Sequence, residues 1–209
     1  TVISSPTPAD AYLRLISQWQ SPGNIVLGSE EPQTLIAQAE NWDHIPDLTR
    51  QMMYLDSMTY LPDDILAKVD RASMAWSLEA RVPLLDHRVV DFAWTLPRHM
   101  KVSDGVTKSI LRDVLYKYVP REVIERPKWG FAIPLHDWLR GPLRDWADTL
   151  LDEQRLISEG YFRPKEILRV WQEHLSGRRN WHTHLWSVLI FQAWLDRSNS
   201  SDRATLAAA

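Results

Sequence analysis

The chain has 209 residues, which is enough for one hydrophobic core with appendages but not for two large independent domains. Its 24 Lys and Arg against 27 Asp and Glu give a formal net charge of −3, without a long block of either sign, so a chain-wide nucleic-acid or membrane charge pattern is excluded. Because no cysteine is present, disulfides, thiolate nucleophiles and cysteine-based zinc sites are excluded as well.

Glycine is scarce, and this limits the nucleotide-binding motifs that the chain can contain. The 7 glycines are scattered singly, and neither G-x-x-x-x-G-K-[ST] nor G-x-G-x-x-G occurs.

The longest apolar run, Val188 to Phe191, is far below the roughly 18 residues of a membrane span. We therefore expect a soluble, cytoplasmic protein. Its start, TVISSPTPAD, has no signal-peptide pattern and no Met, which suggests an internal start within a longer protein.

Residues 1–46 are expected to form a loosely organised helical lead-in. Apolar residues share one face of a short helix over Ala9–Trp19, and a second helix is predicted over Pro32–Glu40. Period-2 alternation is nearly missing from the whole chain, with Asn24–Leu27 as the one short strand candidate. The predicted fold class is therefore all-α or nearly so.

A core helix is predicted over Asp47–Tyr60, where apolar residues recur at helical spacing. Pro62 should end it, because proline lacks the N–H that the helix needs. Asp63 or Asp64 is then expected to cap a further helix that runs to Trp76.

The remaining chain shows the same helical periodicity. It predicts five helices, at residues 87–96, 107–119, 138–151, 164–175 and 181–196. Asp86 should cap the first, Gly177 should end the fourth, and the fifth is apolar on nearly every side, so it should run through the core. The main helical part thus covers residues 47–197, and the polar tail 198–209 is expected to be disordered.

Three segments occur in a specific order: YLPDDILAKVDRASMAWSLEARVPLLD at 60–86, TKSILRD at 107–113 and RPKWGFAIP at 126–134. With their spacing they resemble the asparagine synthase domain of glutamine-hydrolysing asparagine synthetase B and its relatives, over most of residues 48–140. The resemblance implies the helical C-terminal portion of an ATP-pyrophosphatase-type (adenine nucleotide alpha hydrolase-like) α/β domain, whose sheet is encoded upstream.

The resemblance also implies what this chain lacks. The family's S-G-G-x-D-S pyrophosphate loop, its G-E-G-x-D-E segment and its cysteine-dependent glutaminase domain lie upstream of the matched region, and none of them occurs here. Those parts would be this chain's partners in a full-length ligase that uses ATP, Mg²⁺, aspartate and ammonia from glutamine and forms an acyl-adenylate. The isolated chain is expected to be inactive and to bind no cofactor. No nucleic-acid or membrane partner is expected, and a homodimer that hides exposed apolar surface is an option.

The resemblance assigns the phosphate contacts to lysines. Lys128, in the predicted loop 126–134, corresponds to the catalytic lysine that stabilises the α-phosphate and the departing pyrophosphate, and Lys108 to a second phosphate contact. Each could instead be an ordinary surface lysine. Arg112 lies four residues after Lys108, so it could face the same phosphate or pair with a nearby acid.

Other candidates have structural explanations of equal or greater weight. Asp63 and Asp64 are candidate acids or magnesium ligands, yet paired Asp after proline also suits a helix start. His182 and His184 would point to different sides of a helix, which argues against a metal site.

Two competing functions stay open at this point. One is a related amide ligase that acts on another carboxylate, and the other is a non-catalytic helical interaction module.

Overall fold

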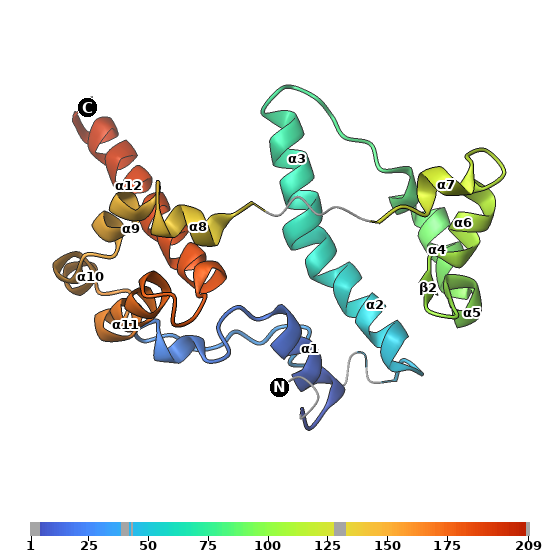
Figure 1. Ribbon diagram of the computed structural model, residues 1–209, viewed down its shortest axis with the longest axis horizontal. Helices are drawn as coiled ribbons and strands as arrows, with labels where there is room; N and C mark the ends of the chain where they lie inside the picture. Colours follow the sequence, from blue (N-terminus) through green and yellow to red (C-terminus); the bar gives the residue numbers. More distant parts are fainter. Residues whose placement is uncertain (1–4, 39–41, 43, 128–132, 208–209) are drawn as a thin grey trace. The chain divides into compact units, whose positions relative to one another are not determined.

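The computed structural model describes residues 5–38, 42, 44–127 and 133–207, with the backbone alone from residue 200 onward (Figure 1). The chain divides into two compact units, and each is described by itself. Unit 1 comprises residues 1–57 and 133–209, and unit 2 comprises residues 58–132. Most elements of the described part are helices, and its one sheet has only two strands. This confirms the prediction of a mostly helical chain.

The first part of unit 1 contains the helices α1 (Pro8–Ile16) and α2 (Leu48–Met58) and the short 3₁₀ helix η2 (Pro22–Asn24). Thr7 caps α1, since its hydroxyl accepts from the Asp10 N–H at 3.1 Å. The predicted helix at 32–40 is wrong for its described residues, 32–38, which form turns instead. Ile36 is buried there beside Trp42, whose indole N–H donates to the Leu35 carbonyl at 3.1 Å, so this packing overrides the local helical pattern.

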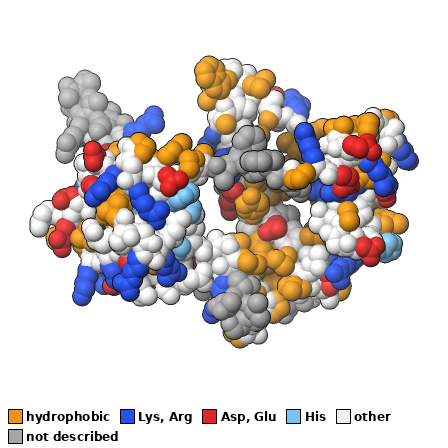
Figure 2. Space-filling model, in the orientation of Figure 1, with side chains coloured by type: hydrophobic (Ala, Val, Ile, Leu, Met, Phe, Trp, Pro, Cys, Tyr) orange, Lys and Arg blue, Asp and Glu red, His pale blue; other side chains and the backbone are white. Residues whose placement is uncertain are grey.

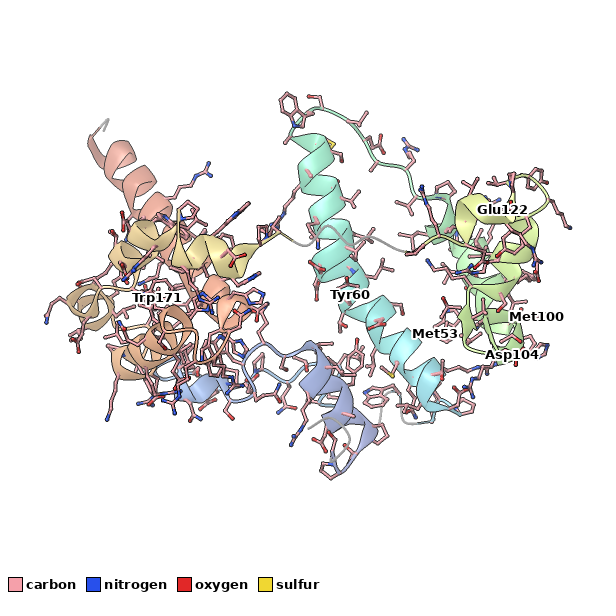
Figure 3. All side chains as sticks on the ribbon, viewed as in Figure 1. Met53, Tyr60, Met100, Asp104, Glu122 and Trp171 are labelled. Atoms are coloured by element: carbon pink, nitrogen blue, oxygen red, sulfur yellow. The ribbon has the colours of Figure 1, made fainter. Side chains whose placement is uncertain are left out.

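The second part of unit 1 is built from five helices. They are α8 (Leu135–Arg140), α9 (Arg144–Leu150), α10 (Glu153–Glu159), α11 (Pro164–Leu175) and α12 (His182–Ala207). The helix predicted over 138–151 is split at Gly141, where a Cβ would lie 3.2 Å from the Asp137 carbonyl oxygen. The sequence did not predict α10. Figure 3 places Trp171 among these helices, where it is buried and donates to Asp148 at 2.7 Å.

Helix α12 confirms the prediction of a helix through the core. Leu185 and Leu189 are fully buried, and so is Gln192, whose amide donates to the Glu159 carboxylate at 2.6 Å. The backbone of α12 continues to Ala207, into the tail for which the sequence predicts disorder. Gly177 follows α11 at φ 72°, the left-handed position that ends a helix, as predicted.

Unit 2 consists of short elements. They are the π-helical turn η4 (Leu61–Leu66), α3 (Ala67–Met74), η5 (Pro83–Leu85), α4 (His87–Thr95), α5 (Arg98–Lys101), β1 (Val102–Ser103), β2 (Val106–Thr107), α6 (Ser109–Leu115) and α7 (Arg121–Ile124). Figure 1 shows α4 to α7 and the hairpin gathered in one cluster. Asp86 caps α4 as predicted, because its carboxylate accepts from the Arg88 N–H at 2.9 Å.

The predicted helix boundary at Pro62 is wrong. The helical backbone continues through Pro62 as η4 and then α3, and the Asp63 N–H still donates to the Thr59 carbonyl at 2.9 Å. A widened π-helical turn accommodates the proline ring and the missing N–H without ending the helix. Consequently neither Asp63 nor Asp64 caps a helix, and that expectation is corrected.

None of the described residues of unit 2 is buried. Large apolar side chains are open to solvent, with Trp76 87% and Tyr118 80% exposed. Figure 2 shows hydrophobic side chains at the surface of the part that carries α3. The core of the described chain therefore lies in unit 1, and unit 2 has apolar surface available for packing.

Candidate functional site

The candidate site in unit 2 is a β-hairpin that leads directly into helix α6. Val102 pairs with Thr107 and Ser103 with Val106, and the turn between them is Asp104–Gly105 with φ 50° and 76°. Two positive φ angles are typical of the tight hairpin turn that favours the sequence Asp-Gly. Figure 3 shows Asp104 at the end of this hairpin. Residue 108 therefore follows the hairpin with no intervening loop.

Lys108 is the N-cap residue of α6 and adopts a left-handed backbone conformation, φ 61° and ψ 35°. The sequence places it in the first helical turn, so the structure shifts it by one position, outside the helix. A left-handed conformation is uncommon for a residue that is neither Gly, Asn nor Asp, and surrounding contacts must stabilise it. Its side chain is exposed, and within the described part of the chain no ion pair or side-chain hydrogen bond engages its ammonium group.

Arg112 holds the backbone on both sides of this residue. Its Nε donates to the Thr107 carbonyl at 3.0 Å, and its backbone N–H donates to the Lys108 carbonyl at 3.0 Å. Ser109 adds a hydrogen bond from its hydroxyl to the Val106 carbonyl at 3.1 Å. The hairpin end and the first turn of α6 are thus tied together at Lys108.

The other end of the Arg112 guanidinium is held by an acid. Nη1 donates to the Glu125 carboxylate at 2.7 Å, and the Tyr116 hydroxyl donates to the same carboxylate oxygen. Arg121 lies over the Tyr116 ring, 4.5 Å from its centroid. Of the two roles that the sequence left open for Arg112, the structure displays the ion pair. The hydrogen bond from Tyr116, and then the charge of Arg112, lower the pKa of Glu125, so this carboxylate stays ionised at neutral pH.

Lys128 lies outside the described residues, as do its neighbours in 128–132. Its role, and the convergence of its amine with that of Lys108, therefore stay predictions. Asp64 forms an exposed ion pair with Lys68 at 3.0 Å, and Asp63 lies beside it on the π-helical turn. A catalytic or magnesium role for these two acids also stays a prediction.

The histidines of unit 1 occupy separate environments. The His182 ring lies 5.9 Å from that of His136, whereas His184 meets Trp19 and Trp181 edge-on at 4.8 Å each. Across the described ranges, no group of three or more His, Asp or Glu side chains could hold a metal ion.

His174 is a buried histidine that the sequence analysis does not single out. It is fully buried on α11, and its Nδ1 accepts from the Trp181 N–H at 3.2 Å. Burial, followed by the charge of Arg140, lowers the pKa of His174 to about 4. A histidine among apolar residues at helical spacing gives no sequence signal for burial, so only the packing of α11 against α12 shows it.

Unit 1 also contains two surface pockets. One of about 810 Å³ is lined by polar residues such as Asp10, Arg14 and Gln18, and the other, of about 350 Å³, by apolar residues such as Ile25 and Phe191. None of the candidate residues predicted from the sequence lines either pocket. Of the helices in the described part, none is long and apolar enough to cross a membrane.

Comparison with known proteins gives one consistent result. The family model described as asparagine synthase matches residues 4–196. Asparagine synthetase [glutamine-hydrolyzing] 1 of Bacillus subtilis (strain 168) is 35% identical over 144 residues, which cover 69% of this chain and 22% of that protein. The hamster Mesocricetus auratus has an asparagine synthetase [glutamine-hydrolyzing] that is 29% identical over 160 residues, covering 67% of this chain and 27% of that protein.

The chain thus spans about a quarter of the length of these relatives. No solved structure matches. The family model covers nearly the whole chain, and the matched range includes Lys108, Arg112 and the segment 126–134, so the chain belongs to the asparagine synthase family.

Proposed function

We propose that this chain is the C-terminal portion of an ATP-dependent amide synthetase that makes asparagine from aspartate, with ammonia released from glutamine. One observation carries the proposal beyond family membership. Lys108 presents an ammonium group with no partner in the described part, on a backbone whose left-handed conformation is fixed by the hairpin and by Arg112. A surface lysine without a function has no need of such a backbone.

The proposed reaction explains why fixed cations are needed. The aspartate side-chain carboxylate attacks the α-phosphorus of ATP, the bond to the pyrophosphate breaks, and an acyl-adenylate forms. Ammonia then attacks the acyl carbon and AMP leaves. Negative charge grows on the leaving pyrophosphate in the first step, so ammonium groups held close to it lower the barrier. We assign this role to Lys128 and, beside it, to Lys108.

Across the described residues, no group of three or more His, Asp or Glu side chains could hold a metal ion by itself. Mg²⁺ prefers several oxygen ligands, often shared with substrate phosphates, and the described acids form no such cluster. Asp64 already pairs with Lys68. In our proposal the metal therefore arrives with ATP and is held by upstream segments of the longer protein, together with the adenine and the aspartate. This chain contributes cations and the shape of the loop that carries them.

Replacing Lys108 with alanine in the complete synthetase should lower the turnover number about 10- to 100-fold, because one preorganised cation is lost. Ammonia-dependent and glutamine-dependent synthesis should fall equally, since the defect lies after ammonia release. Lys108→Arg, which keeps the charge, should retain more activity. Pyrophosphate release with aspartate and either nitrogen source is the measurement.

Lys117→Ala is the matched control, because Lys117 is exposed just beyond α6 and has no proposed role. If Lys108→Ala turned over as fast as Lys117→Ala, Lys108 would have no part in the reaction. A loss confined to glutamine-dependent synthesis would place it in ammonia transfer instead.

A further inference from the structure

We propose that Arg112, Tyr116 and Glu125 form a positioning clamp for Lys108, and that Arg112 is not itself a phosphate ligand. The inference rests on the proposed function of Lys108 and goes beyond it, because it assigns roles to residues that touch no substrate. The three side chains come from α6, its C-terminal end and the residue after α7.

Two hydrogen-bond donors of the Arg112 side chain already bind acceptors within the protein. Nε is committed to the Thr107 carbonyl at 3.0 Å, and Nη1 to the Glu125 carboxylate at 2.7 Å. The guanidinium side chain is only 21% exposed. A planar fork held at both ends by protein acceptors leaves little of the bidentate geometry that phosphate recognition uses. The arrangement favours a structural link over a ligand.

Arg112 links helix α6 to the backbone immediately before Lys108. The carbonyl that accepts from Arg112 belongs to Thr107, and the residue that follows is Lys108 in its left-handed conformation. Such a conformation is strained for a residue with a Cβ and persists only where neighbouring contacts over-determine it. The hairpin turn at Asp104–Gly105 and the Nε of Arg112 both hold the backbone before Lys108, and the backbone N–H of Arg112 holds the carbonyl after it. Releasing Arg112 from Glu125 should let the backbone at 107–108 relax and move the ammonium group.

Tyr116 completes the clamp. Its hydroxyl donates to the carboxylate oxygen that also accepts from Arg112, while its ring lies under Arg121. Tyr116 therefore holds the ionised Glu125 carboxylate in place. A direct phosphate site built on Arg112 would gain nothing from a carboxylate and a phenol directed at that arginine, because the carboxylate repels phosphate. A clamp uses both groups, because Glu125 holds Arg112 and Tyr116 holds Glu125.

The test is a double-mutant cycle in the complete synthetase. Glu125→Ala alone should lower the turnover number about 10- to 100-fold, as an error of about 1 Å in positioning does, with the KM for ATP little changed. Added to Lys108→Ala, it should cause no further loss, because its effect passes through Lys108. Glu125→Gln keeps an oxygen that accepts from both partners and should restore part of the activity. Arg112→Lys should not, because one ammonium cannot reach both acceptors.

Two results of this cycle would contradict the clamp. If Glu125→Ala multiplies the defect of Lys108→Ala, Glu125 acts elsewhere and the clamp is wrong. If Glu125→Ala tightens ATP binding, Arg112 is a phosphate ligand that Glu125 restrains, and the clamp is again wrong. Glu166→Gln, which removes a comparable exposed ion pair with Arg169 at 3.2 Å, is the control and should leave turnover unchanged.

A second measurement separates failure of the clamp from failure of the proposed function. Hydrogen exchange of the amides at 104–112 in this chain should accelerate in Glu125→Ala and not in Glu166→Gln. Accelerated exchange without any kinetic effect of Lys108→Ala would retain the clamp as structure and refute the function of Lys108. Unchanged exchange would refute the clamp.

Discussion

Replacing Lys128 with alanine in the complete synthetase should raise the barrier to pyrophosphate release by about 2 to 4 kcal/mol, which is about 30- to 1000-fold in rate. The resemblance places this lysine against the α-phosphate and the leaving pyrophosphate, where charge grows in the transition state. A cation fixed there contributes more to the transition state than to bound ATP. The loss should therefore appear in the turnover number and much less in the KM for ATP.

The measurement is single-turnover formation of the acyl-adenylate, together with steady pyrophosphate release, for the parent and the Lys128→Ala proteins. Lys165→Ala removes an exposed lysine of α11 that has no proposed role and serves as the control. Turnover of Lys128→Ala equal to that of Lys165→Ala would remove Lys128 from the mechanism. A change in KM alone would make it a binding residue without a role in the chemical step.

Acidification should destabilise unit 1 through His174. The pKa of this buried histidine is lowered to about 4, whereas an unfolded histidine titrates near 6.5. Between these two values the unfolded chain binds a proton that the folded chain does not. The stabilising contribution of neutral His174 is therefore complete above pH 6.5, falls as the pH is lowered, and is exhausted near pH 4. The total is about 3 kcal/mol, from the difference between the two pKa values.

Burial is the main cause of the lowered pKa, and the hydrogen bond at Nδ1 favours the neutral ring in the same direction. This atom accepts from the Trp181 N–H, so a proton there would break a buried bond and place a charge next to Arg140, which donates to the His174 carbonyl at 2.8 Å. His136 and His182 add like charge when they are protonated. A variant that cannot be protonated should lose this part of the pH dependence.

Urea unfolding of His174→Gln and of the parent chain at pH 7.5, 6 and 4.5 measures the effect. The parent should be the more stable protein at pH 7.5, and its advantage should shrink by about 2 to 3 kcal/mol at pH 4.5. His44→Gln, at an exposed position of unit 1, is the control. A stability difference between His174→Gln and the parent that does not change with pH would show that His174 has the same pKa in the folded and unfolded chains.

Local signals in the sequence predicted local structure well. Asp86 caps α4 and Gly177 ends α11 as expected, because capping depends on side chains and φ angles within a few residues. The Asp104–Gly105 hairpin carries an equally local signal, and the sequence interpretation overlooked it because the flanking strands have only two residues each. Helix α12 was predicted because its apolar positions surround the helix.

Features that depend on more than the local sequence pattern are not predictable in this way. Pro62 predicts a helix end, and only the hydrogen bonds around it decide for a π-helical turn. Residues 32–38 have helical periodicity, yet the packing of Ile36 and Trp42 on Tyr12 and Leu55 takes precedence. In the candidate site, the resemblance predicts Lys108 as a phosphate contact, whereas its left-handed backbone, and the link from Arg112 to Glu125 and Tyr116, are visible only in the structure.

In our proposal this chain supplies phosphate-stabilising cations to a synthetase but not the nucleotide site. Neither glycine-rich phosphate-binding motif occurs in its sequence, and the described acids form no metal cluster. Two lysines attract phosphate only weakly, and salt screens that attraction.

Two measurements on the purified chain test this proposal. One is calorimetric titration with magnesium ATP at near-physiological salt, and the other is an assay for pyrophosphate release with aspartate and ammonia. We expect no micromolar binding and no pyrophosphate. Micromolar binding, or steady pyrophosphate release that Lys128→Ala abolishes, would show that the chain is a complete catalytic unit and contradict the account.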